Sequence, residues 1–253
     1  MKSEHNGRFV WHELLTSDPQ AAISFYSSVV GWTTQPFNSD YTMWVGSQGP
    51  LGGVMQLPDE AKKMGAPPHW MGSVQVDGID GAVAKVRKLG GRIYVEPKEI
   101  PTVGRIAVIG DIDGAPLGLI EPITPMAPHS SDKPGEFAWN ELYANNQEAS
   151  LNFYSELFGW KKTNSFDMGP IGAYVIFGIG GKDLGGMMNK PKEMPAPPMW
   201  AYYAELADLN AALHQAKAKG AQVVNAPQDV PGGRMAQLID PQGAFFAMHQ
   251  LAR

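Results

Sequence analysis

Cysteine is absent from the 253 residues of the chain. Its absence excludes disulfide bonds, a thiol nucleophile and every zinc site built on cysteine ligands. The chain also lacks a run of about 18 apolar residues, so no segment is expected to span a membrane. Its polar start has no apolar core of a signal peptide, and together with the missing disulfides this favours a cytoplasmic location.

Basic residues are fewer than acidic ones, and the formal net charge is −5 at neutral pH. Without a stripe of Lys and Arg, the chain is not expected to bind nucleic acid. The apolar fraction of 43% and the charged fraction of 18% are ordinary for a folded protein. The 29 glycines and 21 prolines are numerous, which favours short strands and frequent turns over long helices.

The most informative feature is an internal repeat at an offset of 128 residues. Residues 9–32 read FVWHELLTSDPQAAISFYSSVVGW, and residues 137–160 read FAWNELYANNQEASLNFYSELFGW. Ten of the 24 aligned positions are identical, far more than chance supplies. The tripeptide LGG also recurs, at 51–53 and 184–186. A repeat of this length divides the chain into two related halves.

Each copy of the repeat reads as a strand followed by a helix. Residues 9–15 are apolar and β-prone, and Asp18 with Pro19 supplies an N-cap and a first helical residue. Apolar residues then recur at spacings of three and four until Gly31, which ends the helix. Short apolar runs split by turn residues follow, so the unit is predicted as β-α-β-β-β.

The same βαβββ module is predicted four times along the chain. WMGSVQV at 70–76 opens the second module and aligns with WAYYAEL at 200–206, which opens the fourth. We therefore expect an α+β protein of two domains, residues 7–123 and 136–253, with two βαβββ modules in each. Residues 124–135 are rich in Pro and Ser without periodicity, which predicts a linker.

The repeated strand and helix resemble the vicinal oxygen chelate superfamily, which includes glyoxalase I, bleomycin resistance proteins and extradiol dioxygenases. The matching positions are Asp18, Phe25, Tyr26, Gly31 and Trp32 in the first half and Phe153, Tyr154, Gly159, Trp160 and the Asp240-Pro241-x-Gly243 turn in the second. The resemblance covers nearly the whole chain, as in tandem-domain glyoxalase-like proteins. It implies two glyoxalase-like domains with curved half-barrel sheets, an intramolecular pseudo-dimer, and a small-molecule ligand or substrate in a cleft.

The resemblance also implies where metal ligands would lie, as a His or Glu on the first, fifth and eighth strands of a domain. In this sequence those positions fall on Trp11, Met71 and Gly118 in the first domain and on Trp139, Ala201 and Ala247 in the second. None of these side chains is a suitable metal ligand. We therefore expect no metal cofactor at the usual place and assign no metal-binding residue. A divalent metal at a displaced site is the alternative.

His12 lies beside one of these positions. Because side chains alternate along a strand, an inward-facing Trp11 directs His12 outward. The expectation is a partly exposed or interface histidine, whereas a one-residue bulge would reverse its direction and make it a ligand. Its counterpart in the second half is Asn140, a poor ligand, which weakens the second reading.

The same alternation selects the residues that share the inner face. Four of them carry groups suited to acid–base catalysis or to a displaced metal site: Glu13, His69, Glu141 and His249. Four others are predicted to contact a ligand: Trp11, Trp139, Tyr203 and Glu205. For Glu13 and Glu141 the alternative is structural, each pairing with a backbone group or with a Lys or Arg of the other repeat.

Three functions fit these features. The first is a metal-free binding protein that holds a small organic molecule in a cleft, as bleomycin resistance proteins do. The second is a divalent-metal-dependent lyase or dioxygenase of the glyoxalase or extradiol dioxygenase kind. The third is a metal-free enzyme that uses Glu13 or Glu141 as general base. The positions of the expected ligands favour a protein without the usual metal, and they leave open whether it is an enzyme.

Overall fold

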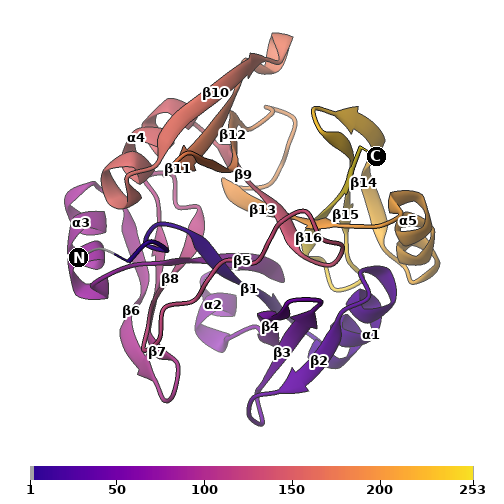
Figure 1. Ribbon diagram of the computed structural model, residues 1–253, viewed down its shortest axis with the longest axis horizontal. Helices are drawn as coiled ribbons and strands as arrows, with labels where there is room; N and C mark the ends of the chain where they lie inside the picture. Colours follow the sequence, from indigo (N-terminus) through magenta and orange to yellow (C-terminus); the bar gives the residue numbers. More distant parts are fainter. Residues whose placement is uncertain (1–2, 253) are drawn as a thin grey trace. The chain divides into compact units, whose positions relative to one another are not determined.

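The computed structural model describes residues 3–252, and its elements follow the predicted order (Figure 1). The first half contains β1 (Phe9–Thr16), α1 (Pro19–Val29), β2 (Thr33–Pro36), β3 (Tyr41–Gly46), β4 (Gly49–Gln56), α2 (Asp59–Lys63), β5 (His69–Gln75), α3 (Ile79–Lys88), β6 (Arg92–Ile100), β7 (Gly104–Gly110) and β8 (Pro116–Pro122). The second half contains β9 (Phe137–Ala144), α4 (Gln147–Phe158), β10 (Lys161–Asp167), the 3-10 turn η1 (Gly169–Ile171), β11 (Ala173–Ile179), β12 (Lys182–Asn189), β13 (Met199–Glu205), α5 (Leu209–Ala218), β14 (Gln222–Val230), β15 (Gly233–Ile239) and β16 (Phe245–Leu251).

The strands form two eight-stranded mixed sheets, one from each half of the sequence. Their orders are β2-β3-β4-β1-β5-β8-β7-β6 and β10-β11-β12-β9-β13-β16-β15-β14. The strands after each helix form an antiparallel meander, and the last of them pairs in parallel with the first strand of its module, as β4 does with β1. Both orders have two ends, so the sheets are open and not closed barrels. The predicted α+β architecture of four βαβββ modules is confirmed.

Packing groups the modules differently from the sequence repeat. Unit 1 holds residues up to Val10 together with Gly72–Pro128 and Asn140–Trp200, and unit 2 holds Trp11–Met71, His129–Trp139 and the chain from Ala201 onwards. Each unit therefore combines one module from each half. The predicted domain boundaries describe the repeat of the sequence, and they stay a prediction for the independence of each half.

The first residues of each half pack on a tryptophan of the other half, in the core of one unit. In unit 1, the Phe9 ring lies 5.5 Å from the Trp160 ring, and Trp160 Nε1 donates to Gly7 O at 2.6 Å. In unit 2, the Phe137 ring lies 5.4 Å from the Trp32 ring, and Trp32 Nε1 donates to the Gly135 carbonyl at 2.6 Å. The two tryptophans that close the repeat thus hold the entry of the opposite half.

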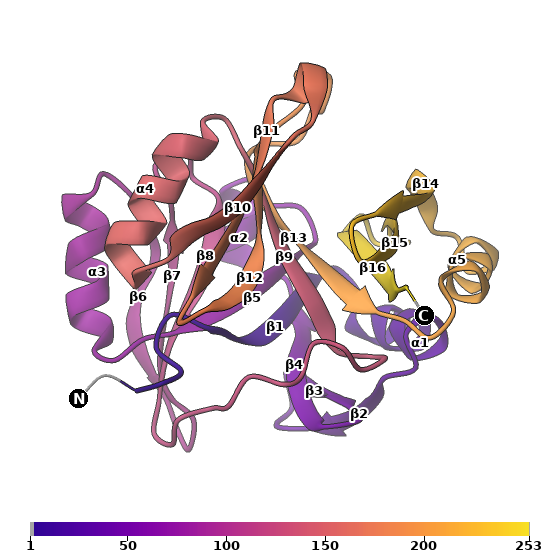
Figure 2. The same ribbon diagram turned by 45° about the horizontal axis from the view of Figure 1, so that its top comes forward.

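The repeated Phe-Tyr pair explains why the helices sit where they do. In unit 2, α1 lies beside α5, and in unit 1, α3 lies beside α4 (Figure 2). The Tyr26 side chain on α1 is fully buried, its hydroxyl donates to Asp240 Oδ2 at 2.9 Å, and it accepts from Trp70 Nε1 at 2.9 Å. In unit 1, Tyr154 on α4 accepts from Trp200 Nε1 at 3.1 Å. The hydroxyl of a tyrosine therefore anchors α1 in unit 2 and α4 in unit 1.

The predicted helix starts are confirmed, but two segments differ from expectation. Asp18 caps α1 by accepting from the Ala21 N–H at 3.0 Å. The short helix α2 was not predicted, because a single turn offers no periodicity to detect. Strand β6, for which the apolar run 92–95 predicts only the first part, continues through Pro97. It is an edge strand with register shifts, so no ladder hydrogen bond is lost at that residue. Within residues 3–252, no helix combines the length and apolarity needed to cross a bilayer.

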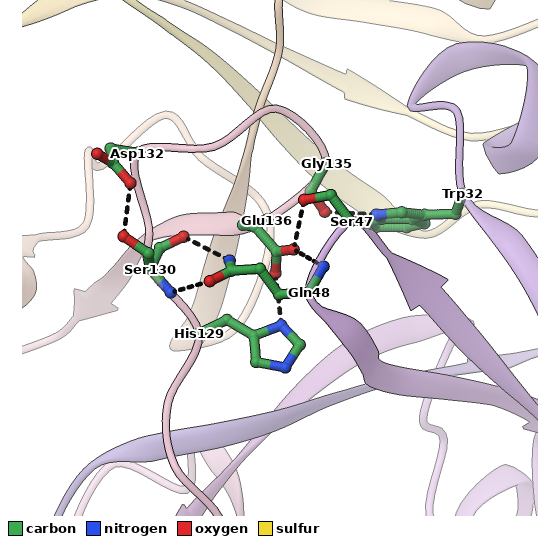
Figure 3. A network of polar contacts seen from close by, with 8 residues as sticks. All are labelled: Trp32, Ser47, Gln48, His129, Ser130, Asp132, Gly135 and Glu136. Carbon is green, nitrogen blue, oxygen red and sulfur yellow. Dashed lines mark hydrogen bonds and ion pairs between the residues drawn. The ribbon is translucent and has the colours of Figure 1, made fainter.

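The end of the predicted linker is tied to unit 2 through buried Glu136 (Figure 3). Its Oε2 lies 2.7 Å from His129 Nδ1, and its Oε1 accepts from the Gln48 N–H at 3.3 Å. The Gln48 side chain also exchanges two hydrogen bonds with the Ser130 backbone. Burial acts to raise the pKa of Glu136, but the hydrogen bonds and charge of His129 together with Gln48 outweigh it and leave the pKa lowered. Residues 129–136, which precede β9, are thus held in place by these hydrogen bonds.

Candidate functional site

The half-buried side of β1 carries a hydrogen-bonded set of three side chains. Trp11 and Glu13 are two residues apart and therefore share a face of the strand. The Tyr41 hydroxyl, from β3, accepts from Trp11 Nε1 at 2.7 Å and donates to Glu13 Oε1 at 2.7 Å. The predicted common face of Trp11 and Glu13 is confirmed, and Tyr41 fixes both side chains.

The Tyr41 side chain can lie across the sheet only because Gly53, which it covers, has no side chain. A Cβ atom at Gly53 would lie 2.2 Å from the Tyr41 hydroxyl, well inside contact distance. At the neighbouring Gly52, a Cβ atom would lie 1.9 Å from the backbone oxygen of His12. The two glycines of the LGG tripeptide are therefore needed for the approach of β1 and for the position of Tyr41.

The electrostatics of this set keep the tyrosine neutral. Burial raises the pKa of Tyr41 well above its usual value, and the negative charge of Glu13 raises it further. A neutral hydroxyl can donate to Glu13 while accepting from Trp11, which is the arrangement observed. The set therefore presents one indole ring, one phenol and one carboxylate on the same face.

The second half repeats this arrangement within unit 1. The Tyr174 hydroxyl on β11 donates to Glu141 Oε1 on β9 at 2.8 Å. A Cβ atom at Gly186 would lie 2.0 Å from that hydroxyl, so the second LGG tripeptide serves the same purpose. Glu141 is 6% exposed. Trp139, the remaining predicted contact on this strand, is partly exposed two residues before Glu141.

Tyr41 and Tyr174 were missed by the sequence reasoning. The available signal was their equal spacing from the last glycine of LGG in both halves. Glu13 and Glu141 each accept a hydrogen bond from a tyrosine, and their alternative role as structural pairs stays a prediction. The recurrence of the two glutamates thus reflects a recurring Glu–Tyr pair.

His12, predicted to be partly exposed or to lie at an interface, is buried against residues of the second half. It faces the side of β1 opposite to Trp11, in agreement with the alternation, but it is only 6% exposed. Its ring stacks on Phe137 at 3.9 Å and meets the edge of Tyr202 at 5.0 Å, all within unit 2. Strand alternation gave the direction of the side chain, whereas the aromatic cover comes from distant segments that the alternation does not describe.

A histidine–carboxylate pair lies on the fourth module. Glu205 at the end of β13 is opposite His249 on β16 in the parallel register. Glu205 Oε2 lies 2.6 Å from His249 Nδ1, and Oε1 accepts from the Leu251 N–H at 2.8 Å. Glu205 is 3% exposed, and each of its two carboxyl oxygens has a hydrogen-bond partner, as a buried polar group requires. Of the second-half residues predicted on the inner face, His249 and Glu205 thus lie within hydrogen-bond distance of each other.

Tyr203 belongs to a second polar chain on the same module. Gln237 Nε2 donates to the Tyr203 hydroxyl, and Asn225 Nδ2 donates to Gln237 Oε1. Tyr203 is opposite Ala247 in the register, two residues before the Glu205–His249 pair on each strand. Tyr203 and Glu205 therefore share a strand face, as predicted.

His69 is held at the start of β5. Its Nδ1 lies 2.7 Å from the carbonyl oxygen of Pro67. Burial lowers the pKa of His69, and the bond to Pro67 only partly opposes that effect. The imidazole is therefore favoured in its neutral form, with Nδ1 as the donor to the carbonyl.

The residues at the usual metal positions do not fit a metal ion. On the first and fifth strands those positions are Trp11, Trp139, Met71 and Ala201, and on the eighth they are Gly118 and Ala247. The register sets Gly118 opposite Ser73 and Ala247 opposite Tyr203, so neither eighth-strand position offers a carboxylate. Across residues 3–252, no group of three or more His, Asp or Glu side chains is placed to hold an ion.

Two curated relatives match nearly the whole chain. The protein named "Putative glyoxylase CFP32" of Mycobacterium tuberculosis is 32% identical over 245 residues, which cover 94% of this chain and 92% of the relative. The anthracycline biosynthesis protein DnrV of Streptomyces peucetius is 25% identical over 259 residues, covering 97% and 94%.

Solved structures share the fold at low sequence identity. The Mn(II)-bound glyoxalase from Novosphingobium aromaticivorans has a TM-score of 0.65 at 13% identity, covering 99% of this chain and 83% of the other. The 2,3-dioxygenase LapB from Pseudomonas sp. KL28 has a TM-score of 0.67 at 12% identity, covering 98% and 94%. The model of the Glyoxalase/Bleomycin resistance protein/Dioxygenase superfamily matches residues 8–119 and 136–248, the two halves of the repeat. The chain therefore belongs to the Glyoxalase/Bleomycin resistance protein/Dioxygenase superfamily.

Proposed function

We propose that this protein binds a small organic molecule on the strand faces that carry the Glu–Tyr pairs, without the metal site usual in its superfamily. The observation that carries the proposal is the hydrogen-bonded set of Trp11, Tyr41 and Glu13. This set occupies the part of the first strand where relatives place a metal ligand. An indole, a phenol and a carboxylate, groups that recognise organic ligands, therefore stand where the metal ligand would be.

The chemistry of the set suits a planar ligand with hydrogen-bond donors. The Trp11 indole offers an apolar ring for stacking, and Glu13 offers carboxylate oxygens to a hydroxyl or amine. The neutral Tyr41 holds both in fixed positions, which lowers the entropy cost of binding. An aromatic ligand also agrees with the name of the relative DnrV, an anthracycline biosynthesis protein.

In this proposal Glu13 and Glu141 act as hydrogen-bond acceptors. Each already accepts a hydrogen bond from a tyrosine, at 2.7 Å for Glu13 and 2.8 Å for Glu141. Because the usual ligand positions carry no donor, no step of binding is assigned to a metal. Binding is expected to persist in the presence of a chelator.

The test is a fluorescence titration of the full chain with a panel of hydroxylated aromatic compounds in EDTA. Tyr41→Phe removes two hydrogen bonds, each worth about 0.5–1.5 kcal/mol, so the affinity of binders should fall about tenfold. Tyr94→Phe is the matched control, since its hydroxyl donates to the Gly114 carbonyl at 2.8 Å within unit 1 and is not part of the set. Equal effects of the two substitutions, or chemical conversion of every binder, would contradict the proposal.

The second candidate is a divalent-metal-dependent lyase or dioxygenase of the glyoxalase or extradiol dioxygenase kind. The fold shared with the Mn(II)-bound glyoxalase favours it. Elemental analysis of protein purified without chelators separates the two candidates. About one ion per chain, with activity that requires the ion, would support the metalloenzyme and refute metal-free binding.

A further inference from the structure

Equivalent positions in the second and fourth modules perform a common structural task. Gln75 at the end of β5 accepts from the Met126 N–H at 2.9 Å. Glu205 at the end of β13 accepts from the Leu251 N–H at 2.8 Å. Both side chains are buried, and both hold backbone at or beyond the end of the last strand of their module. An uncharged amide is therefore sufficient for the task.

The fourth module adds a charge and an imidazole to this arrangement. The residue opposite Gln75 is Ile120, whereas the residue opposite Glu205 is His249. His249 Nδ1 lies 2.6 Å from Glu205 Oε2. Since the second module is built without either ionisable group, the fold does not require the pair, and a functional role is indicated.

The geometry assigns different roles to the two ring nitrogens of His249. A carboxylate at Glu205 only accepts hydrogen bonds, so Nδ1 carries the hydrogen, and in a neutral imidazole Nε2 then bears the lone pair. The His249 side chain keeps 15% of its surface exposed. A Cβ atom at Gly233 would lie 2.8 Å from Nε2, so a larger residue at this position would crowd that nitrogen.

We infer that His249 Nε2 is a proton acceptor for a ligand with an acidic hydroxyl, such as an enol or a phenol, and that Glu205 is its positioning residue. The inference rests on the proposed small-molecule function and concerns an additional contact to the ligand from the fourth module. The ligand O–H bond breaks, its electron pair stays on oxygen, and the proton forms a bond to Nε2. The resulting imidazolium lies beside the Glu205 carboxylate, which compensates its charge.

The experiment measures the reactivity of Nε2 directly, with diethyl pyrocarbonate as the probe. This reagent acylates an imidazole nitrogen that bears a free lone pair. Trypsin cleaves after Arg234, and His249 is the single histidine of residues 235–253, so mass spectrometry follows it alone. We expect His249 to react in the wild-type protein.

Glu205→Gln reproduces the side chain that the second module uses. The amide keeps an oxygen for the Leu251 N–H but presents an NH2 group to Nδ1, which favours the opposite tautomer. The rate of His249 acylation should fall about tenfold or more, since a hydrogen bond to a charged group favours one tautomer by about 1.5–3 kcal/mol. The charge control is Gln75→Glu, which should leave the rate unchanged.

Two outcomes would overturn the inference. One is an unreactive His249 in a sample whose exposed His214 on α5 reacts, and the other is an equal rate in Glu205→Gln. If that variant does not fold, the 15N chemical shifts of the His249 ring in the wild-type protein decide, because an Nε2–H tautomer contradicts the assignment. No ligand is needed, so failure of the binding titration is distinguishable from failure here.

Discussion

The Tyr26 hydroxyl links two modules of unit 2, and removing it is a sharp test of how that unit is held together. In Tyr26→Phe the buried ring keeps its contacts with Trp70 and Phe246, while both hydrogen bonds are lost. Trp70 Nε1 is left without its acceptor, and Asp240 loses one of its donors. The substitution therefore isolates the polar part of the contact.

The magnitude follows from these two losses. A buried polar group that loses its partner costs about 1–3 kcal/mol. The loss at Asp240 falls at the lower end, because its other oxygen still accepts from the Gln242 and Ala244 N–H groups at 2.9 and 2.8 Å. We expect the free energy of unfolding to fall by about 2–4 kcal/mol at neutral pH.

The cost should also depend on pH. Burial raises the pKa of Asp240, and the Ala244 N–H and the Tyr26 hydroxyl oppose that rise. Without the hydroxyl, the pKa in the folded state moves further up. A carboxyl group whose pKa is raised on folding contributes stability below its unfolded pKa, about 3.9, and loses it as the pH rises. The substitution is therefore more costly at neutral pH than at about pH 4.

The assay is urea unfolding of the wild-type and variant proteins at both pH values. Tyr154→Phe is the matched variant in unit 1, because Tyr154 accepts from Trp200 Nε1 and bonds to buried Asp111. It should show a cost of similar size. A cost below about 0.5 kcal/mol for Tyr26→Phe, or a larger cost at acid than at neutral pH, would refute this reasoning.

Three further predictions concern other parts of the molecule. Gly53→Ala should destabilise by about 1–3 kcal/mol in thermal unfolding, since its Cβ meets Tyr41, whereas Gly81→Ala, in open space on α3, should stabilise by about 0.5–1 kcal/mol. Phe9→Ala should cost about 3–5 kcal/mol in urea unfolding, and a small effect would contradict its place in the core of unit 1. Glu136→Gln should lower the free energy of unfolding by about 1 kcal/mol at neutral pH and by less below about pH 4. The reason is that a carboxyl group with a lowered pKa contributes its full stability above the unfolded pKa, about 4.3, and loses it as the pH falls. A cost that does not change with pH would exclude the His129 pair as the cause.

The repeat predicted the modules because its signals act between residues that are close in the sequence. Asp18 as N-cap, the apolar face of the first helix and Gly31 act within a few residues, so their structure follows from the sequence. The grouping of modules into units was not predictable in this way. Both halves carry the same Phe, Tyr and Trp positions, so the pattern does not specify which module packs on which.

The candidate site was predicted in part for the same reason. Strand alternation placed Trp11 with Glu13 and Tyr203 with Glu205, because the period of a strand is a local property. Tyr41 reaches Glu13 from another strand, and its place depends on the register and on the missing side chain of Gly53. Contacts of that kind need the paired strands in three dimensions.

Metal-free binding at the Trp11–Tyr41–Glu13 set is the central claim, and the indole N–H signal of Trp11 reports on it most directly. The signal is identified by its loss in Trp11→Phe, and it is recorded in chelator-treated protein during titration with each hydroxylated aromatic binder. The claim predicts a saturating shift of this signal that Tyr41→Phe weakens about tenfold. A shift that appears only after a divalent ion is restored, or an unchanged Trp11 signal with every binder, would contradict it.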